Sequence, residues 1–172
     1  MRVSLSWLKE LVDIDVKPLE LADRLSMAGF EVEQVEDRSL NAVGVIVGFV
    51  ENIWPHPNAE KLRVCNIKVG SNKSEQIVCG AKNIKEGIHV AVALEGVYLP
   101  AVDLQIKETS LRGVSSNGMV CSGTELGLEA SSEGILILDD ILDQKIIIGS
   151  KINDILDLND VILDIAITAN RP

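Results

Sequence analysis

Three polar segments carry most of the side chains that could do chemistry, and short apolar runs separate them. The segments read HPNAEKL (56–62), QIVCGAKN (76–83) and LRGVSSNGMVCSGTE (111–125). They are too irregular to form a helix face and too rich in Asn, Ser, Gly and Lys to form a core. Polar segments of this kind are typical of loops on a rigid scaffold, where binding residues gather. The pattern predicts that the chain recognises a polar partner.

The first segment combines a stiff backbone with three side chains that can bind a polar partner. Pro57 restricts the loop, the amide of Asn58 can donate and accept hydrogen bonds, and Lys61 can meet a phosphate as a point charge. A structural turn, with Asn58 bonded to nearby backbone and Leu62 entering the core, explains the same residues, and we expect both interpretations to hold. We expect His56 and Lys61 to make contacts, with Asn58 as a further candidate.

The second segment places Lys82 and Asn83 directly after a strand-like run that ends in Gly80. One interpretation is a loop that contacts phosphate or sugar. The other is a solvated turn without a binding role. The sequence does not choose between them.

The third segment contains a guanidinium, hydroxyls and an amide at close spacing. Arg112 suits a phosphate or the face of a base, and Ser116 and Asn117 can donate hydrogen bonds. The pair Asn117-Gly118 is by itself a strong hairpin signal, so we expect a β-turn there. We also expect Arg112 and Ser116 to bind at the surface, and Ser122 is close enough in sequence to join them.

The metal-ligating residue types are too few and too scattered to predict a metal site. The three cysteines, Cys65, Cys79 and Cys121, form no CxxC pair, and the only histidines are His56 and His89. A zinc site needs closely spaced ligands. We therefore interpret the cysteines as buried free thiols in a reducing compartment.

Composition predicts a soluble globular chain without the net positive charge that is typical of nucleic-acid binders. The 172 residues are 47% hydrophobic and only 3% aromatic, and 26 acidic against 16 basic residues give a net charge of −10. Nucleic-acid binders usually carry a basic field, so any such binding must come from a local patch. The sequence shows neither a secretory signal nor an apolar run of the roughly 18 residues that suggest a membrane span. We expect a cytoplasmic location.

The polar segments lie inside an all-β region with α/β sequence on both sides. Apolar spacing predicts a helix over 3–12, a second helix between Pro18 and Gly29, and a strand over 30–36. From Val43 onward, short strand-like runs with Gly, Asn and Pro between them favour a small barrel or sandwich. A strand over 134–138, a helix from about Ser150 and a strand over 161–168 are expected after it. The predicted organisation is residues 1–40 and 147–172 as one discontinuous α/β domain, with 41–146 inserted.

Several of these motifs resemble a known family. HPNAEKL, IVCGAKN, LRGVSSNGM and CSGTELG resemble the tRNA-binding OB-fold, a Greek-key β-barrel found in synthetase appendages and free-standing tRNA-binding proteins. The opening MRVSLSWLKELVDI, the GFEVE segment and the closing DIAITANRP resemble bacterial-type phenylalanyl-tRNA synthetase beta subunits. Glu60 departs from the family's loop, which more often has Asp there.

The resemblance implies an α+β fragment that binds or positions tRNA and is itself catalytically silent. It implies that the chain is the N-terminal part of a longer beta subunit, whose complete ligase attaches phenylalanine to its tRNA. ATP and magnesium, together with an alpha subunit in an alpha2-beta2 assembly, belong to that complete enzyme; no cofactor, membrane or DNA is expected for this fragment. The residues expected to bind tRNA are His56, Asn58, Lys61, Lys82, Asn83, Arg112, Ser116, Asn117 and Ser122.

A second hypothesis is a structural or subunit-contact module of the same synthetase, without direct tRNA contact. The acidic balance and the few aromatic residues favour it. The observation that separates the two hypotheses is where exposed apolar side chains gather, on the binding loops or on the α/β surface.

Overall fold

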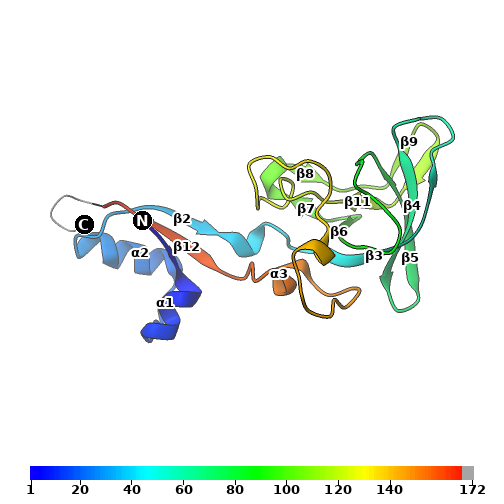
Figure 1. The fold of residues 1–172 in the computed structure, drawn as a ribbon. Helices are drawn as coiled ribbons and strands as arrows, with labels where there is room; N and C mark the ends of the chain where they lie inside the picture. The colour runs from blue at the N-terminus through cyan, green and yellow to red at the C-terminus, as the bar shows by residue number, and fades with distance from the viewer. Residues whose placement is uncertain (168–172) are drawn as a thin grey trace. The chain divides into compact units, whose positions relative to one another are not determined.

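The computed structural model describes residues 1–167 (Figure 1). The chain forms two compact units. Unit 1 contains Met1–Leu40 and the segment from Asp157 onward, and unit 2 contains Asn41–Leu156. Within residues 1–167, no helix has both the length and the apolar character that a membrane span requires.

Unit 1 joins the two ends of the described chain in one sheet. Its elements are β1 (Arg2–Ser4), α1 (Leu5–Leu11), α2 (Pro18–Met27), β2 (Val32–Asp37), the 3-10 helix η1 (Arg38–Leu40) and β12 (Val161–Ile165). The sheet order is β1-β12-β2, and both pairings are antiparallel. Since β12 is the central strand, the segment after the insertion is needed to complete the sheet that the first forty residues begin.

Local sequence explains both helices of unit 1. The hydroxyl of Ser4 accepts a hydrogen bond from the backbone N–H of Trp7 at 3.1 Å and caps α1. Pro18 occupies the first turn of α2, and Gly29 follows the helix with φ +88°. The helix expected over 3–12 starts later, at Leu5, because the residues before it pair with β12 as β1.

Unit 2 is a nearly closed five-stranded barrel, as expected for an OB-fold. Its sheet order is β11-β6-β3-β4-β5. Two hydrogen bonds join the ends of this sheet, from Asn117 N to Gln76 O at 2.9 Å and from Val78 N to the Ser116 hydroxyl at 3.0 Å. The strands of the barrel are β3 (Ile46–Pro55), β4 (Arg63–Gly70), β5 (Lys73–Cys79), β6 (His89–Leu94) and β11 (Gly118–Val120).

Unit 2 also contains shorter elements outside the barrel sheet. They are β7 (Tyr98–Leu99), the 3-10 helix η2 (Pro100–Val102), β8 (Leu104–Gln105), β9 (Thr109–Leu111), β10 (Val114–Ser116), the 3-10 helix η3 (Leu138–Asp140) and α3 (Ile152–Ile155). β7 pairs with β8 and β9 pairs with β10, both antiparallel.

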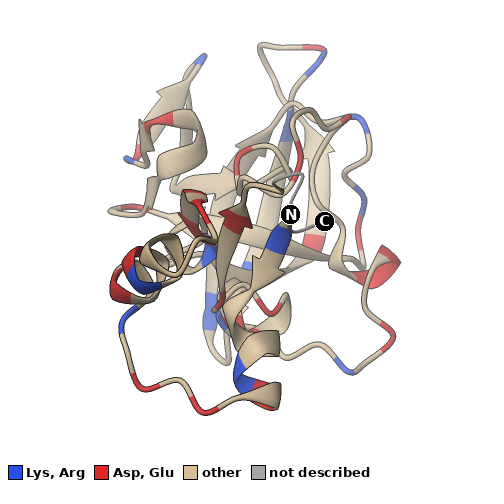
Figure 2. Ribbon diagram, turned by 90° about the vertical axis from the view of Figure 1, so that its left-hand side faces the viewer, with Lys and Arg blue, Asp and Glu red and all other residues tan. Residues whose placement is uncertain are grey.

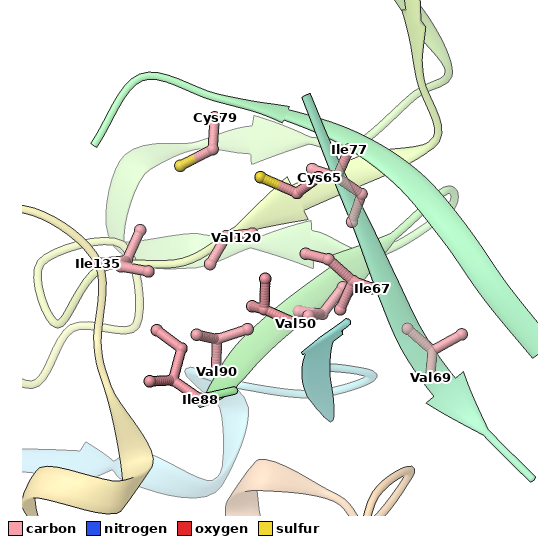
Figure 3. Close-up of a cluster of buried hydrophobic side chains, with 11 residues drawn as sticks. Val50, Cys65, Ile67, Val69, Ile77, Cys79, Ile88, Val90, Val120 and Ile135 are labelled. Atoms are coloured by element: carbon pink, nitrogen blue, oxygen red, sulfur yellow. The ribbon is translucent and has the colours of Figure 1, made fainter. Parts of the chain in front are cut away.

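The barrel core is aliphatic and contains the sulfurs of Cys65 and Cys79. Figure 3 shows Val, Ile and Cys side chains from several strands meeting inside the barrel, with Cys79, Val120 and Ile135 at one end and Val69 at the other. All three cysteines are free and buried, as predicted. Burial raises the pKa of Cys65 and of Cys121 to about 12. These thiols therefore stay protonated near neutral pH and act as small apolar groups.

The long strand β3 bends to pair with both of its neighbours. Its register with β4 shifts between Val50 and Asn52, which marks a β-bulge in this strand. At Gly48 a Cβ would lie 2.6 Å from Val92 Cγ2 and 2.7 Å from Ile67 Cγ2. Glycine at this position therefore lets neighbouring strands bring their side chains together across the barrel.

Three sequence-based expectations for the C-terminal part need correction. The 134–138 segment forms one isolated bridge, Val90 to Ile137, instead of a strand. Residues 147–156 belong to unit 2, because Gly149 N donates to Val47 O at 2.8 Å and Ile152 N donates to Val45 O at 3.0 Å. The helix expected from Ser150 is a single turn, α3, and the last residue of the strand expected over 161–168 lies outside the described residues.

A fourth correction concerns the hairpin. Its two-residue turn is Arg112-Gly113, between β9 and β10, with φ values of +48° and +89°. A type I′ turn requires positive φ at both central residues. At Gly118, where the strand leaves β10 to pair with β6, a Cβ would lie 2.7 Å from Ala93 O. Glycine follows Asn117 because the main chains approach closely there, and no hairpin turn forms.

Candidate nucleic-acid interface

His56 fastens the 56–62 loop to the β9–β10 hairpin. Its Nδ1 accepts from Asn58 N at 3.0 Å, so the proton of the neutral ring lies on Nε2, which donates to Leu111 O at 2.9 Å. The side chain is only 4% exposed. With both ring nitrogens used inside the protein, His56 positions the loop and offers no polar atom to a partner in this conformation. The expectation of a direct His56 contact is corrected accordingly.

Asn58 and Arg112 complete the same connection. Asn58 Nδ2 donates to Arg112 O at 2.9 Å, and Arg112 Nη1 reaches Asn58 O at 3.5 Å. The left-handed backbone at Arg112 turns its carbonyl toward Asn58 while the guanidinium stays at the exposed surface. Two loops separated by about fifty residues in sequence are therefore held as one surface, with Lys61 on the first and Arg112 on the second.

The 80–83 loop lies beside the first loop. A Cβ on Gly80 would lie 3.3 Å from Leu62 Cδ2, so the two segments are in close contact. Asn83 pairs with the backbone of Ile135 in both directions: Nδ2 donates to its carbonyl at 2.9 Å, and Oδ1 accepts from its N–H at 3.0 Å. Asn83 therefore anchors the loop, and Lys82 is left exposed at the surface.

Ser116 and Asn117 close the barrel. Ser116 is 3% exposed, and its hydroxyl accepts from Val78 N at 3.0 Å and donates to Gly118 O at 3.0 Å. Asn117 Nδ2 donates to Glu75 Oε2 at 3.0 Å, and this hydrogen bond is the main cause that lowers the pKa of the Glu75 carboxyl. The surface role expected for Ser116 is wrong, because its hydroxyl is buried and has partners inside the protein.

Ser122 belongs to a capping arrangement with Glu125. Glu125 Oε2 accepts from Ser122 N at 2.6 Å and from its hydroxyl at 2.8 Å, and Glu125 N reaches Ser122 Oγ at 3.3 Å. The spacing Ser-x-x-Glu is a known capping signal, so the sequence contained the information.

Exposed cations lie on the connected loops. Lys61, Lys82 and Arg112 are exposed, and none of the ion pairs among residues 1–167 includes them. Two further exposed residues were not among those expected to bind: Lys107, which lines a groove beside these loops, and Trp54, which is 40% exposed at the end of β3. Both sit in runs that looked like ordinary strands, and their exposure depends on long-range packing.

The groove, of about 530 Å³, opens between the second and third polar segments. Its walls come from the end of β5, from residues 104–111, from β10–β11 and from residues 122–135. Two of its lining residues, Ala81 and Leu111, directly precede Lys82 and Arg112 in the sequence. The groove therefore begins where the exposed cations are.

The charge on the rest of the molecule is mixed. Figure 2 shows Lys and Arg positions scattered along the ribbon among Asp and Glu. The barrel segment 41–150 contains nine basic and thirteen acidic residues, so the loop cations act locally. Among residues 1–167 no group of three or more His, Cys, Asp or Glu is placed to hold a metal ion.

Comparisons with known proteins match the barrel to a family of putative tRNA-binding domains. A family model described as a putative tRNA binding domain matches residues 45–146, which is nearly all of unit 2. The phenylalanine–tRNA ligase beta subunit of Parasynechococcus marenigrum is 56% identical over 172 residues, covering 100% of this chain and 21% of that protein. The beta subunit of Trichormus variabilis is 52% identical over 171 residues, covering 99% and 21%.

Among solved structures, the C-terminal domain of Plasmodium vivax p43 aligns with a TM-score of 0.44 at 30% identity, covering 62% of this chain and 57% of that one. The chain spans about a fifth of the length of the curated relatives it matches. Because the family model matches more than half of its residues, the chain belongs to the putative tRNA-binding domain family.

Proposed function

We propose that unit 2 binds tRNA with the surface formed by the 56–62 loop, the 80–83 loop and the Arg112-Gly113 turn. The observation that carries this proposal is the family match over the barrel, whose three polar segments meet on one surface. Lys61, Lys82 and Arg112 supply the phosphate contacts, and Asn58, exposed and bonded to the Arg112 backbone, is a further contact. His56, Asn83, Ser116, Asn117 and Ser122 hold the surface in shape.

The chemistry of this surface fits recognition of RNA backbone and shape. A few exposed cations on connected loops can meet several phosphates, and phosphate contacts fix the position of a protein on a nucleic acid. Because the barrel is acidic outside these loops, affinity should be modest and should fall as salt rises. A modest affinity still raises the local concentration of tRNA beside a linked enzyme.

We propose further that the chain serves as the N-terminal part of a beta subunit of phenylalanine–tRNA ligase. The similarity over the whole chain supports this role. In that setting the tRNA is specific for phenylalanine, an alpha subunit is the partner in an alpha2-beta2 enzyme, and the location is the cytoplasm. ATP and magnesium would serve the complete ligase, and residues 1–167 would hold neither.

A second candidate function, a protein-contact role, is favoured for unit 1. Its helices expose large apolar side chains: Trp7 is 56% exposed, Leu11 64%, Leu19 70% and Met27 89%. The connected loops of unit 2 show no comparable group. Several large apolar side chains exposed on two short helices favour a protein-contact role. The two roles are compatible, because they belong to different units.

An NMR titration of the isotope-labelled 172-residue chain with tRNA tests the assignment. The proposal predicts amide shift changes at Asn58, Lys61, Lys82 and Arg112, with the residues of α1 and α2 unaffected. Changes confined to unit 1, or no changes at low salt, would leave the contact role as the function of this chain.

A further inference from the structure

The groove beside the connected loops has the size and lining of a small-ligand site. Its volume of about 530 Å³ lies within the roughly 300–1,000 Å³ range of such sites. Leu104, Leu111 and Met119 supply apolar wall, and Met sulfur is polarizable enough to pack well on an aromatic ring. Gln105, Thr109 and Ser132 add hydrogen-bonding groups. A flat ring with a polar edge fits this combination.

The charges at the groove orient such a ligand. Lys107 lines the groove, and Lys82 and Arg112 directly follow lining residues. Glu125 lies inside, and burial together with the charge of this carboxylate raises the pKa of Cys121. A phosphate is attracted to the cations and repelled by Glu125. A bound nucleotide would therefore keep its phosphate at the cationic side and direct its base inward.

Glu125 is held so that one oxygen can face a ligand. The hydrogen bonds from described residues to its carboxylate, from Ser122 N and Oγ, both end on Oε2. Oε1 is then an acceptor for a donor on the base edge. Cytosine presents an amino group at N4, whereas uracil has a carbonyl oxygen there and an N3–H flanked by two carbonyls. A carboxylate accepts a hydrogen bond from the amino group of cytosine and repels the carbonyl oxygen of uracil.

We propose that this groove takes one unpaired nucleotide of a bound RNA, with the base inside, and that Glu125 selects bases bearing an exocyclic amino group. The inference rests on the proposed tRNA-binding function and deepens it by adding a base-reading subsite. The loops provide phosphate contacts, and the groove provides the preference for a base.

The test compares single-stranded oligocytidylate with oligouridylate of equal length, using the full chain. We expect cytidine-dependent amide shifts at Gly80, Ala81, Ser122 and Gly134, and about tenfold tighter binding of oligocytidylate, which is a modest effect for a contact to a base edge. Glu125→Gln keeps an acceptor for Ser122 but can donate as well as accept. This variant should bind both oligonucleotides about equally.

Glu129→Gln is the matched control, because Glu129 is an exposed nearby carboxylate outside the groove lining; it should keep the preference for cytidine. Equal binding of the two oligonucleotides by the unmodified chain overturns the proposal, and so do shifts that avoid the groove. If tRNA binds while neither oligonucleotide does, the groove proposal fails and the tRNA-binding function stands. If tRNA itself does not bind, both fail.

Discussion

At the scale of single residues, the proposed binding surface depends on side chains whose polar atoms are hydrogen-bonded within the protein. His56 and Asn58 hold two loops together, and the exposed cations obtain their spacing from this connection. The three polar segments predicted from the sequence lie together in the structure, and their binding role stays a prediction. The sequence could not separate residues that contact a partner from residues that hold the loops in place. A hydrogen bond between residues 56 and 111 leaves no local sequence pattern.

His56→Ala should destabilise unit 2 by about 1–3 kcal/mol, because the variant leaves Asn58 N and Leu111 O without their buried partner. It should also weaken tRNA binding, since Lys61 and Arg112 lose their fixed separation. Urea unfolding followed by circular dichroism measures the first effect. Lys61→Ala, an exposed change in the same loop, should stay within about 0.5 kcal/mol. Equal stability of the two variants would show that His56 does not fasten the loops.

The Asp139 carboxyl should make the free energy of unfolding depend on pH. Desolvation raises the pKa of its carboxyl, but hydrogen bonds from His89 N and the His89 ring prevail, so the net shift is downward. A carboxyl whose folded pKa is lowered stabilises the protein above its unfolded pKa, and this contribution is lost as pH falls through the folded pKa. The unmodified chain should therefore be more stable than Asp139→Asn at neutral pH and lose that advantage in strong acid.

The control for this experiment is Asp140→Asn, a change at the neighbouring exposed carboxyl. Urea unfolding at a series of pH values gives the stability difference for each variant. A constant difference between the unmodified chain and Asp139→Asn down to strong acid would contradict the assignment.

At the scale of elements, short strand-like runs with Gly, Asn and Pro between them predicted most strands of the barrel, and Pro18 and Gly29 predicted the limits of α2. The errors came from tertiary context. Asn117-Gly118 carried the stronger hairpin signal, yet the turn formed at Arg112-Gly113, because the chain at Gly118 passes close to the β6 backbone. The 147–156 segment joined the barrel through backbone pairing with Val45 and Val47, which no local pattern reveals.

Closure of the barrel gives a prediction at this scale. Ser116→Ala removes the buried acceptor of Val78 N, so we expect a loss of about 1–3 kcal/mol in the free energy of unfolding and faster hydrogen exchange at the Val78 amide. Ser115→Ala, the adjacent exposed residue, should change neither quantity much. Unchanged protection at Val78 in the Ser116 variant would mean that this hydroxyl does not close the barrel.

At the scale of the whole molecule, a chain with a net charge of −10 presents a few cations where the family match and the loop geometry coincide. Composition alone argued against nucleic-acid binding. The local arrangement reverses that inference for one surface of unit 2, while unit 1 exposes apolar helices. The two units thus divide the proposed work between RNA contact and protein contact.

The most direct measurement is fluorescence anisotropy of labelled tRNA titrated with the chain over a range of salt concentrations. We predict binding that weakens with salt. A Lys61→Glu/Arg112→Glu variant should bind more weakly, with a salt slope lower by about one for each phosphate that it no longer neutralises. Lys145→Glu is the control. This variant reverses an exposed charge in the segment that leads to Gly149. Gly149 lies by Val69 O, near the C-terminal end of β4, whereas the 56–62 loop lies at the N-terminal end of that strand. Unchanged affinity and slope in the double variant, with an intact circular dichroism spectrum, would contradict the account.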